Sequence, residues 1–195
     1  MDVAFSPNGN IIASASKDTT VRLWENNIQG NSATIRAHSA SVRSVNFSSN
    51  GRLLVSTSDD KSVKVWNVLD HRFQYSLLKH KNWVRTGAFS PDGRLIASGG
   101  DDKIVNLWDT ETKTDLFEFR DHDGVINCVK FHPDGTNLAT ASYDRKIKIF
   151  DIRSKRLLQH YDAHAANINS IAFHPTGHYL ISTSNDAKLK IWDLR

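Results

Sequence analysis

Serine, histidine and aspartate recur together along this sequence, and hydrolases use these side chains for nucleophilic catalysis. The trio His38, Ser56 and Asp60 returns at intervals of 42 residues in every complete copy, once with threonine in place of serine. A serine nucleophile beside a histidine base would suit acyl transfer. A catalytic site occurs once in a domain, however, whereas this trio repeats at fixed spacing. The repetition therefore favours a structural role for the trio and predicts that the chain is not an enzyme.

The same 42-residue interval extends over the whole chain. A turn of the type Ser-Pro-Asp-Gly, at residues 90–93 in the best-formed copy, appears five times. Its proline fixes φ, and its glycine can adopt positive φ. In that copy the residue pattern predicts four short β-strands, at 83–89, 95–98, 104–108 and 116–119. Because the third strand ends in Trp108-Asp109, the repeat resembles the blade of a WD40 β-propeller, which has four short strands in about 40–45 residues.

The predicted fold is therefore all-β, a partial WD40 β-propeller that forms one domain over residues 1–195. The repeats are expected at 1–37 (partial), 38–79, 80–121, 122–163 and 164–195, and the last lacks its outer strand. Propellers of this family most often have seven blades, so the chain is expected to supply about 4.6 of seven four-stranded blades and to sweep ~235° of a ring. Its two end blades would then expose apolar faces and strand edges, which favour association.

The resemblance to WD40 proteins also gives the repeated polar residues a role. In WD40 blades a histidine, a serine or threonine, an aspartate and a tryptophan form a buried hydrogen-bonded tetrad. Such a network satisfies polar groups that burial would otherwise penalise by about 1–3 kcal/mol each. The implied tetrads are His38, Ser56, Asp60 and Trp66; His80, Ser98, Asp102 and Trp108; and His164, Ser182, Asp186 and Trp192. A fourth set, His122, Thr140 and Asp144, ends in Phe150, which has no N–H, so that network is expected to lack one hydrogen bond.

Composition and charge limit the other function classes. The net charge of +4 comes from 25 basic and 21 acidic residues that are dispersed along the chain, so nucleic-acid binding is not expected. The single cysteine, Cys128, excludes an internal disulfide framework and fits a reducing compartment. No apolar run approaches the ~18 residues of a membrane span, and neither a signal peptide nor a phosphate-binding loop is expected. The repeated histidines belong to different blades, so neither a metal site nor another cofactor is expected.

Several segments match a narrower family than the WD40 repeat. They are residues 36–45, 59–66, 80–96, 156–161, 173–175 and 179–181. The general WD40 pattern does not explain Asn82-Trp83-Val84-Arg85 or the run Leu-Leu-Gln-His-Tyr at 157–161. In these segments the chain resembles the centriolar "proteome of centriole" WD40 family over nearly its whole length, as the second to sixth blades of a seven-blade propeller.

This resemblance implies a non-catalytic protein-interaction scaffold of the cytoplasm and cytoskeleton. It would lie in the wall of the centriole or basal body, stabilise microtubules there and support cilium assembly. The expected partners are centriolar or microtubule-wall proteins, and tubulin is a candidate because its surface is acidic. The alternative is a WD40 adaptor that recognises peptides in a nuclear or ubiquitin-ligase complex.

The expected binding surface is the propeller rim at the entrance of the first strands. Residues that flank the first valine of each blade, or precede the turn aspartate, differ between copies, and variation on a repeated frame can carry specificity. Trp83 is the sharpest candidate, because its counterparts are serine, valine and asparagine and because Trp, Tyr and Arg are enriched at binding hot spots. The alternative is that Trp83 only covers a neighbouring loop. The expected rim consists of Trp83, Arg85, Tyr143, Arg43, Asp59, Asp101, Asn127 and Asn169.

Three of these rim residues are expected to form one compact patch. Trp83 and Arg85 lie two residues apart, so their side chains should leave one strand on the same side. Tyr143 occupies the slot before the turn aspartate of the next blade. An aromatic ring, a guanidinium and a phenol at this place could grip an extended acidic segment of a partner.

Overall fold

The computed structural model describes residues 1–27 and 30–195, and all regular secondary structure in these residues is β-strand. The strands β1 to β19 form five antiparallel sheets, which we number as blades 1 to 5 along the chain. Blades 1 to 4 have four strands each and blade 5 has three. The predicted all-β, partial WD40 propeller is confirmed. In the described residues no helix is long and apolar enough to cross a membrane.

The strands follow one another in each blade from the centre of the molecule outward. Blade 1 consists of β1 (Asp2–Phe5), β2 (Ile11–Ala15), β3 (Thr20–Glu25) and β4 (Ser32–Arg36). Blade 2 consists of β5 (Val42–Phe47), β6 (Leu53–Ser58), β7 (Val63–Asn67) and β8 (Phe73–Leu77). Blade 3 consists of β9 (Val84–Phe89), β10 (Leu95–Gly100), β11 (Val105–Asp109) and β12 (Asp115–Phe119). Blade 4 consists of β13 (Ile126–Phe131), β14 (Asn137–Ser142), β15 (Lys146–Asp151) and β16 (Arg156–Asp162). Blade 5 consists of β17 (Ile168–Phe173), β18 (Tyr179–Ser184) and β19 (Leu189–Asp193).

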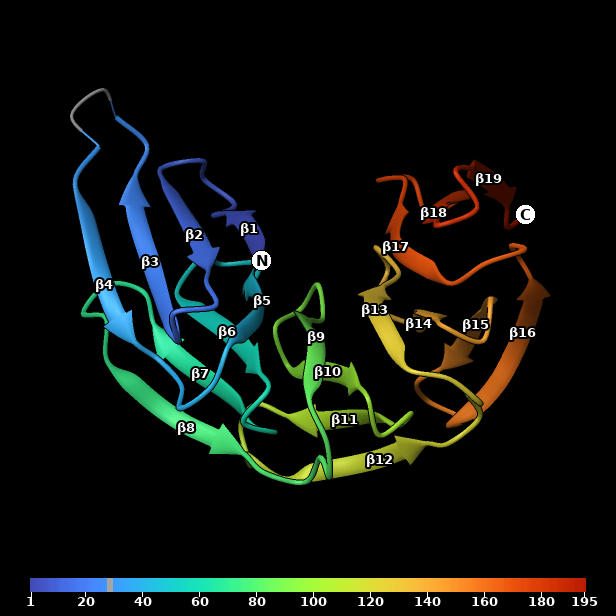
Figure 1. Cartoon of the computed structure of the whole chain (residues 1–195), viewed down its shortest axis with the longest axis horizontal. Helices are drawn as coiled ribbons and strands as arrows, with labels where there is room; N and C mark the ends of the chain where they lie inside the picture. Colours follow the sequence, from blue (N-terminus) through green and yellow to red (C-terminus); the bar gives the residue numbers. More distant parts are fainter. Residues whose placement is uncertain (28–29) are drawn as a thin grey trace.

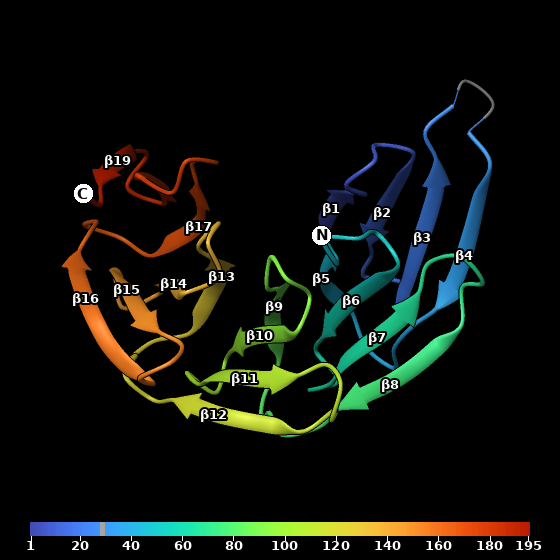
Figure 2. The same cartoon turned by 180° about the vertical axis from the view of Figure 1, so that it is seen from behind.

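The five blades form an open arc rather than a closed ring (Figure 1). The outer strands β8, β12 and β16 follow the convex side of the arc, and β9, β13 and β17 lie on its concave side. The view from behind shows the same order, with blade 1 and blade 5 separated by a gap (Figure 2). The arc therefore places the first strands of all blades around one common centre.

The repeating turn explains how the first two strands of each blade connect. Its glycines, Gly9, Gly51, Gly93, Gly135 and Gly177, have φ between +69° and +77°. This left-handed conformation costs glycine nothing, because it has no Cβ to clash. The expectation of positive φ at the turn glycine is thus confirmed. In blade 3 the predicted strands also agree with the structure to within two residues at each end.

Apolar side chains fill the space between neighbouring blades. In β11, which is covered on both faces, residues 105–108 are all buried. Blades 1 and 5 each lack one neighbour, and the same repeat positions are open there. Val3 is 61 % exposed whereas Val45, one repeat later, is 2 % exposed; Ile191 is 65 % exposed whereas Val65 is fully buried. The open ends of the arc therefore present surfaces of the kind that is buried between blades inside it.

Candidate functional site

The repeated polar residues form hydrogen-bonded chains that tie each blade to the loop before it. In blade 3, His80 Nδ1 lies 2.8 Å from Asp102 Oδ2, and His80 Nε2 lies 2.7 Å from Ser98 Oγ. The indole N–H of Trp108 donates to the same Oγ at 2.8 Å. Because a carboxylate only accepts, Nδ1 donates to Asp102 and Nε2 accepts from the Ser98 hydroxyl. His80 lies in the loop before β9, so these hydrogen bonds fix the loop between two blades against β10 and β11.

The same geometry is present in blades 2 and 5. The distance from histidine Nδ1 to the aspartate is 2.8 Å for His38 and 2.9 Å for His164. The hydroxyl groups of Ser56 and Ser182 lie 2.7 and 2.8 Å from Nε2, and each accepts an indole N–H at 2.9 Å. The tetrads implied by the resemblance to WD40 blades are therefore assembled in blades 2, 3 and 5. Among the described residues of blade 1, the indole N–H of Trp24 donates the corresponding hydrogen bond to the Ser14 hydroxyl at 3.0 Å.

The hydrogen-bond network of the tetrad is incomplete in blade 4. His122 lies 2.6 Å from Asp144 and 2.7 Å from Thr140, so the first two bonds are present. Phe150 occupies the tryptophan position, is fully buried and donates nothing to Thr140. Its ring packs against Phe119 of blade 3, with 4.4 Å between the ring centroids. Apolar contact between blades takes the place of the missing hydrogen bond.

The tetrad aspartates remain ionised in this buried setting. Burial by itself would raise the pKa of Asp144, but the hydrogen bond from His122 and those from backbone N–H donors lower that pKa to about 2. Burial opposes ionisation of Asp102 in the same way, and the hydrogen bond from His80 again lowers its pKa. A carboxylate that accepts several hydrogen bonds favours its charged form. Each aspartate can therefore hold its histidine in one orientation.

The tetrads cannot act as hydrolytic sites. The hydroxyl groups of Ser56, Ser98, Thr140 and Ser182 belong to side chains with no exposed surface, so a substrate cannot reach them. In three blades the hydroxyl oxygen also accepts an indole N–H, which would oppose nucleophilic attack. Over residues 1–27 and 30–195 no group of three or more His, Cys, Asp or Glu is placed to hold a metal ion. Cys128 is buried.

A β-bulge brings the variable rim residues to the mouth of the central space. In blades 2 to 5 the first strand shifts its register against the second, and the shift leaves one residue without a partner on the ladder. These residues are Arg43, Arg85, Asn127 and Asn169. A bulge redirects its side chain away from the regular alternation of a strand. Together with Tyr143 and Met1, the four residues line a shallow cavity of about 250 Å³.

Arg43 joins blade 2 to Trp83 of blade 3. Its guanidinium donates two hydrogen bonds to Asp59, at 2.6 and 2.7 Å. The same group lies 5.3 Å from the centre of the Trp83 ring, within the range of a cation–π interaction. Trp83 remains 42 % exposed, just before β9. The ion pair therefore holds an indole in place while one side of it stays accessible.

Arg85 repeats this arrangement one blade further on. It forms an ion pair with Asp101 and lies 6.0 Å from the centre of the Tyr143 ring, which is half exposed. The hydrogen bond from Arg85 to Asp101 raises the pKa of the guanidinium above its usual value. The expected patch thus has a different arrangement, because Arg85 partners Tyr143 whereas Trp83 is partnered by Arg43. Both guanidinium charges are already compensated by aspartates of the chain itself.

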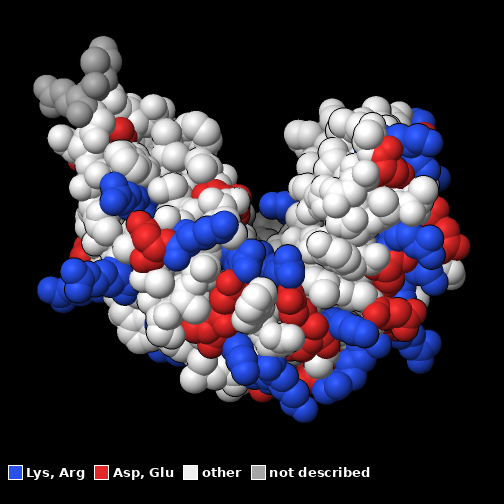
Figure 3. Space-filling view, viewed as in Figure 1, with Lys and Arg blue, Asp and Glu red and all other residues white. Residues whose placement is uncertain are grey.

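Asparagines replace the arginines in blades 4 and 5. Asn127 donates to the carbonyl of Ile168 at 2.7 Å, and Asn169 donates to the side chain of Asn185 at 2.5 Å. The rim is therefore charged over blades 2 and 3 and neutral over blades 4 and 5, and its two rings, Trp83 and Tyr143, come from blades 3 and 4. On the face seen in Figure 3, Lys and Arg alternate with Asp and Glu along the edge of the arc, and no broad area of one sign is visible.

The repeat contains a second set of hydrogen-bonded polar residues that the sequence analysis missed. Lys64 and Lys190 donate their ammonium groups to the carbonyl of the residue before the tetrad histidine, at 2.8 and 2.5 Å, and Lys148 makes the equivalent bond. Blade 3 has Asn106 at this position. Its Nδ2 contacts His80 at 3.1 Å, and its buried Oδ1 has no hydrogen-bond partner among the described residues. The signal was visible as a lysine four residues after three of the turn aspartates.

An open arc of antiparallel blades that carry buried His–Ser–Asp–Trp hydrogen-bond networks defines this protein as a WD40 β-propeller. Proteins of this class generally act as non-enzymatic scaffolds that bind other proteins. The chain matches the family described as WD domain, G-beta repeat over residues 1–25, and the family described as nucleolar protein 10-like, N-terminal domain over residues 16–195. Because the second match covers most of the sequence, the chain belongs to the nucleolar protein 10-like N-terminal β-propeller family. Neither match names the centriolar family, and no curated protein matches the chain.

Proposed function

We propose that the chain binds a partner protein through the rim of blades 2 to 4. The observation that carries this proposal is the pair of half-exposed rings, Trp83 and Tyr143, each held by an arginine that is itself fixed by an aspartate. A ring that is already oriented loses little conformational entropy on binding, and this makes it an effective anchor. No residue of the repeated tetrads is needed for this contact.

The ion pairs also indicate the chemistry of the partner. Arg43 and Arg85 already form ion pairs with Asp59 and Asp101, so an acidic segment of a partner would have to displace these aspartates. An extended segment that lays apolar side chains on the two rings fits the rim better. Polar backbone groups of the segment could meet the amides of Asn127 and Asn169 in the shallow cavity.

Aromatic deletions on the rim test this proposal. Trp83→Ala and Tyr143→Ala in the full-length protein should each weaken partner recovery in co-immunoprecipitation by about tenfold, the loss that a hot-spot residue of about 1.4 kcal/mol produces. The melting temperature should stay nearly constant, because both rings are half exposed. Leu116→Ala, an exposed apolar residue of β12, is the matched control and should recover partners normally. Unchanged recovery by the double variant Trp83→Ala/Tyr143→Ala would place binding elsewhere.

One proposed setting for this scaffold is the centriole or basal body. It rests on the resemblance of residues 82–85 and 157–161 to the centriolar WD40 family. In this setting the chain would support the stability of the microtubule wall and cilium assembly, with centriolar proteins or tubulin as partners.

A second setting is a nuclear protein complex, in which the propeller would be an adaptor. It rests on the name of the matched family, which refers to a nucleolar protein. Imaging of the tagged full-length protein separates the two settings. Signal at centrioles would support the first and reject the second, and signal in the nucleolus would do the opposite.

A further inference from the structure

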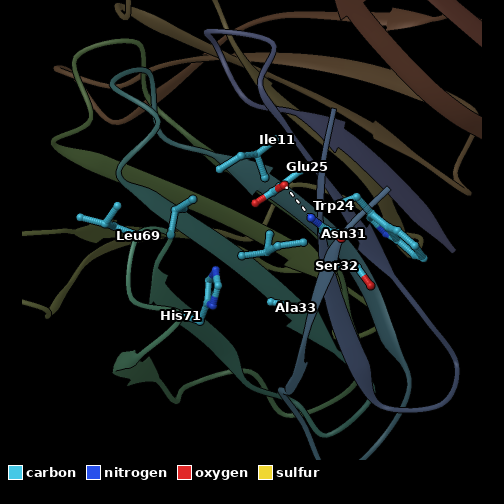
Figure 4. Close-up of a pocket in the computed structure, with 10 residues that line it drawn as sticks. Ile11, Trp24, Glu25, Asn31, Ser32, Ala33, Leu69 and His71 are labelled. Atoms are coloured by element: carbon cyan, nitrogen blue, oxygen red, sulfur yellow. Dashed lines mark hydrogen bonds between the residues drawn. The ribbon is translucent and has the colours of Figure 1, made fainter. Parts of the chain in front are cut away.

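A cavity between blades 1 and 2 lies at the end of the strands opposite to the rim. It has a volume of about 380 Å³ and is lined from blade 1 by Ile11, Leu23, Trp24, Glu25, Asn31, Ser32 and Ala33. The loop between β7 and β8 of blade 2 adds Val68, Leu69 and His71. Figure 4 shows this lining, with Leu69 and His71 on the loop side and Ala33 on the strand side. The walls are mostly apolar, as in sites that receive a side chain of a ligand.

The repeat shows why this space is open. Ala33 lies opposite Leu23 in the outer strand pair of blade 1. In blades 2 and 3 the equivalent partners are Tyr75, opposite Val65, and Phe117, opposite Leu107. An aromatic ring therefore occupies the position in two neighbouring blades, whereas blade 1 has only a methyl group there.

A second repeated residue covers each of these rings. Lys113 Nζ lies 5.3 Å from the centre of the Tyr75 ring, and Lys155 Nζ lies 5.3 Å from the centre of the Phe117 ring. His71 stands at the same repeat position, and its φ of 58° matches the 61° of Lys113 and the 58° of Lys155. The residue that would cover the ring is thus present in blade 2, and the ring itself is missing from blade 1.

Charge at the mouth of the cavity limits what can enter. Among the lining residues that the structure describes, Glu25 is the one acidic group, and lysine and arginine are absent. Oε2 of Glu25 accepts from Asn27 at 2.9 Å, which orients the carboxylate. Leu69, beside the opening, is 90 % exposed. An acidic and apolar mouth complements a ligand that carries a basic group next to an apolar one.

We infer that the cavity between blades 1 and 2 binds an aromatic side chain from an extended segment of a partner protein, with a lysine or arginine of that segment paired to Glu25. The partner's ring would occupy the place that Tyr75 and Phe117 fill in the next two blades. Leu69 and His71 would cover it from the blade 2 side. This site is separate from the rim, so it does not depend on the function proposed above.

A peptide selection on the full-length protein tests the site directly. The probe is a phage-displayed library of random decapeptides, and the expected enriched motif is Phe, Tyr or Trp beside Lys or Arg. Ala33→Phe fills the cavity from inside and should weaken an enriched peptide at least tenfold, with an unchanged or raised unfolding midpoint. Glu25→Gln should reduce the preference for the basic residue while the aromatic preference remains.

Two further variants keep the test decisive. Tyr75→Ala should open an equivalent site between blades 2 and 3 and increase the number of binding sites for the same peptide. If Ala33→Phe fails to fold, Leu69→Asp replaces it, because Leu69 is exposed and its change should weaken binding without unfolding. Enriched peptides without an aromatic residue, or full affinity in both Ala33→Phe and Leu69→Asp, would overturn the inference. Trp83→Ala should leave this binding intact, which separates failure of this site from failure of the rim.

Discussion

Replacing Phe150 by tryptophan should lower stability unless Phe119 changes with it. The indole would give Thr140 the donor that the other tetrads have, and one such bond contributes about 1 kcal/mol. Phe150 is fully buried, however, and its ring centroid lies only 4.4 Å from that of Phe119. Forcing a larger ring into such a site costs about 1–3 kcal/mol. The single variant Phe150→Trp is therefore expected to lose about 1 kcal/mol of unfolding free energy.

Blade 3 indicates which second change restores the fit. One repeat earlier, the residue at the Phe119 position is Leu77 of blade 2, which belongs to the same buried cluster as Trp108 of blade 3. Phe119→Leu alone should lose about 1–2 kcal/mol, because it removes an aromatic pair and leaves a void beside Phe150. The double variant Phe150→Trp/Phe119→Leu should recover to within about 0.5 kcal/mol of the parent. The coupling between the two changes is then about 2 kcal/mol.

Urea denaturation of the full-length propeller measures this coupling as a double-mutant cycle. An unchanged m value would show that the variants alter stability rather than the extent of unfolding. Trp108→Phe in blade 3 is the reference, because it removes the same indole bond from a complete tetrad and should lose stability. A coupling within about 0.5 kcal/mol of zero, or a clear gain of stability from Phe150→Trp alone, would refute the argument that Phe119 and Phe150 together replace a tryptophan.

Three further outcomes follow from the structure. The pKa of Asp144 is lowered to about 2 from 3.8, so the stability that its ionised form contributes is complete above about pH 4 and is lost as the pH falls toward 2. Asp144→Asn should therefore flatten this part of a curve of unfolding free energy against pH. The isolated chain should associate through the apolar faces of blades 1 and 5, and Phe5→Glu with Ile191→Glu should raise the monomer fraction in analytical ultracentrifugation; a sharply melting monomer of the unmodified chain would contradict this. Asn106→Lys should gain about 1 kcal/mol in chemical denaturation, because it removes a buried unpaired oxygen and supplies the lysine bond of the other blades; a loss would show that the contact of Asn106 with His80 matters more.

The fold could be predicted because its information is local and repeated. A glycine with positive φ after each first strand, a tight turn at each aspartate and an aromatic residue near the end of each third strand fix one blade within about 40 residues. The tetrads followed from the resemblance of the repeat to WD40 blades, and the constant spacing assigned their residues in each blade. Blade 4 was also predictable, because Phe150 has no N–H to donate.

The arrangement of the rim could not be predicted in the same way. Arg43 and Trp83 are 40 residues apart, and Arg85 and Tyr143 belong to different blades. Their pairing depends on the rotation between blades and on the bulges that redirect the arginines, and neither is encoded in strand alternation. The sequence therefore placed Trp83 beside Arg85, whereas the structure pairs each ring with the arginine of the preceding blade.

The sequence by itself determined the number, order and internal bonding of the blades, because each blade repeats one pattern of turns, strands and buried polar groups. Only the tertiary structure decided which side chains meet between blades. It paired the charges of the rim arginines with Asp59 and Asp101, and it left a cavity where Ala33 replaces the ring of Tyr75 or Phe117. The physical reason is that contacts between blades depend on the packing of two sheets against each other, whereas contacts within a blade depend on spacing along one chain.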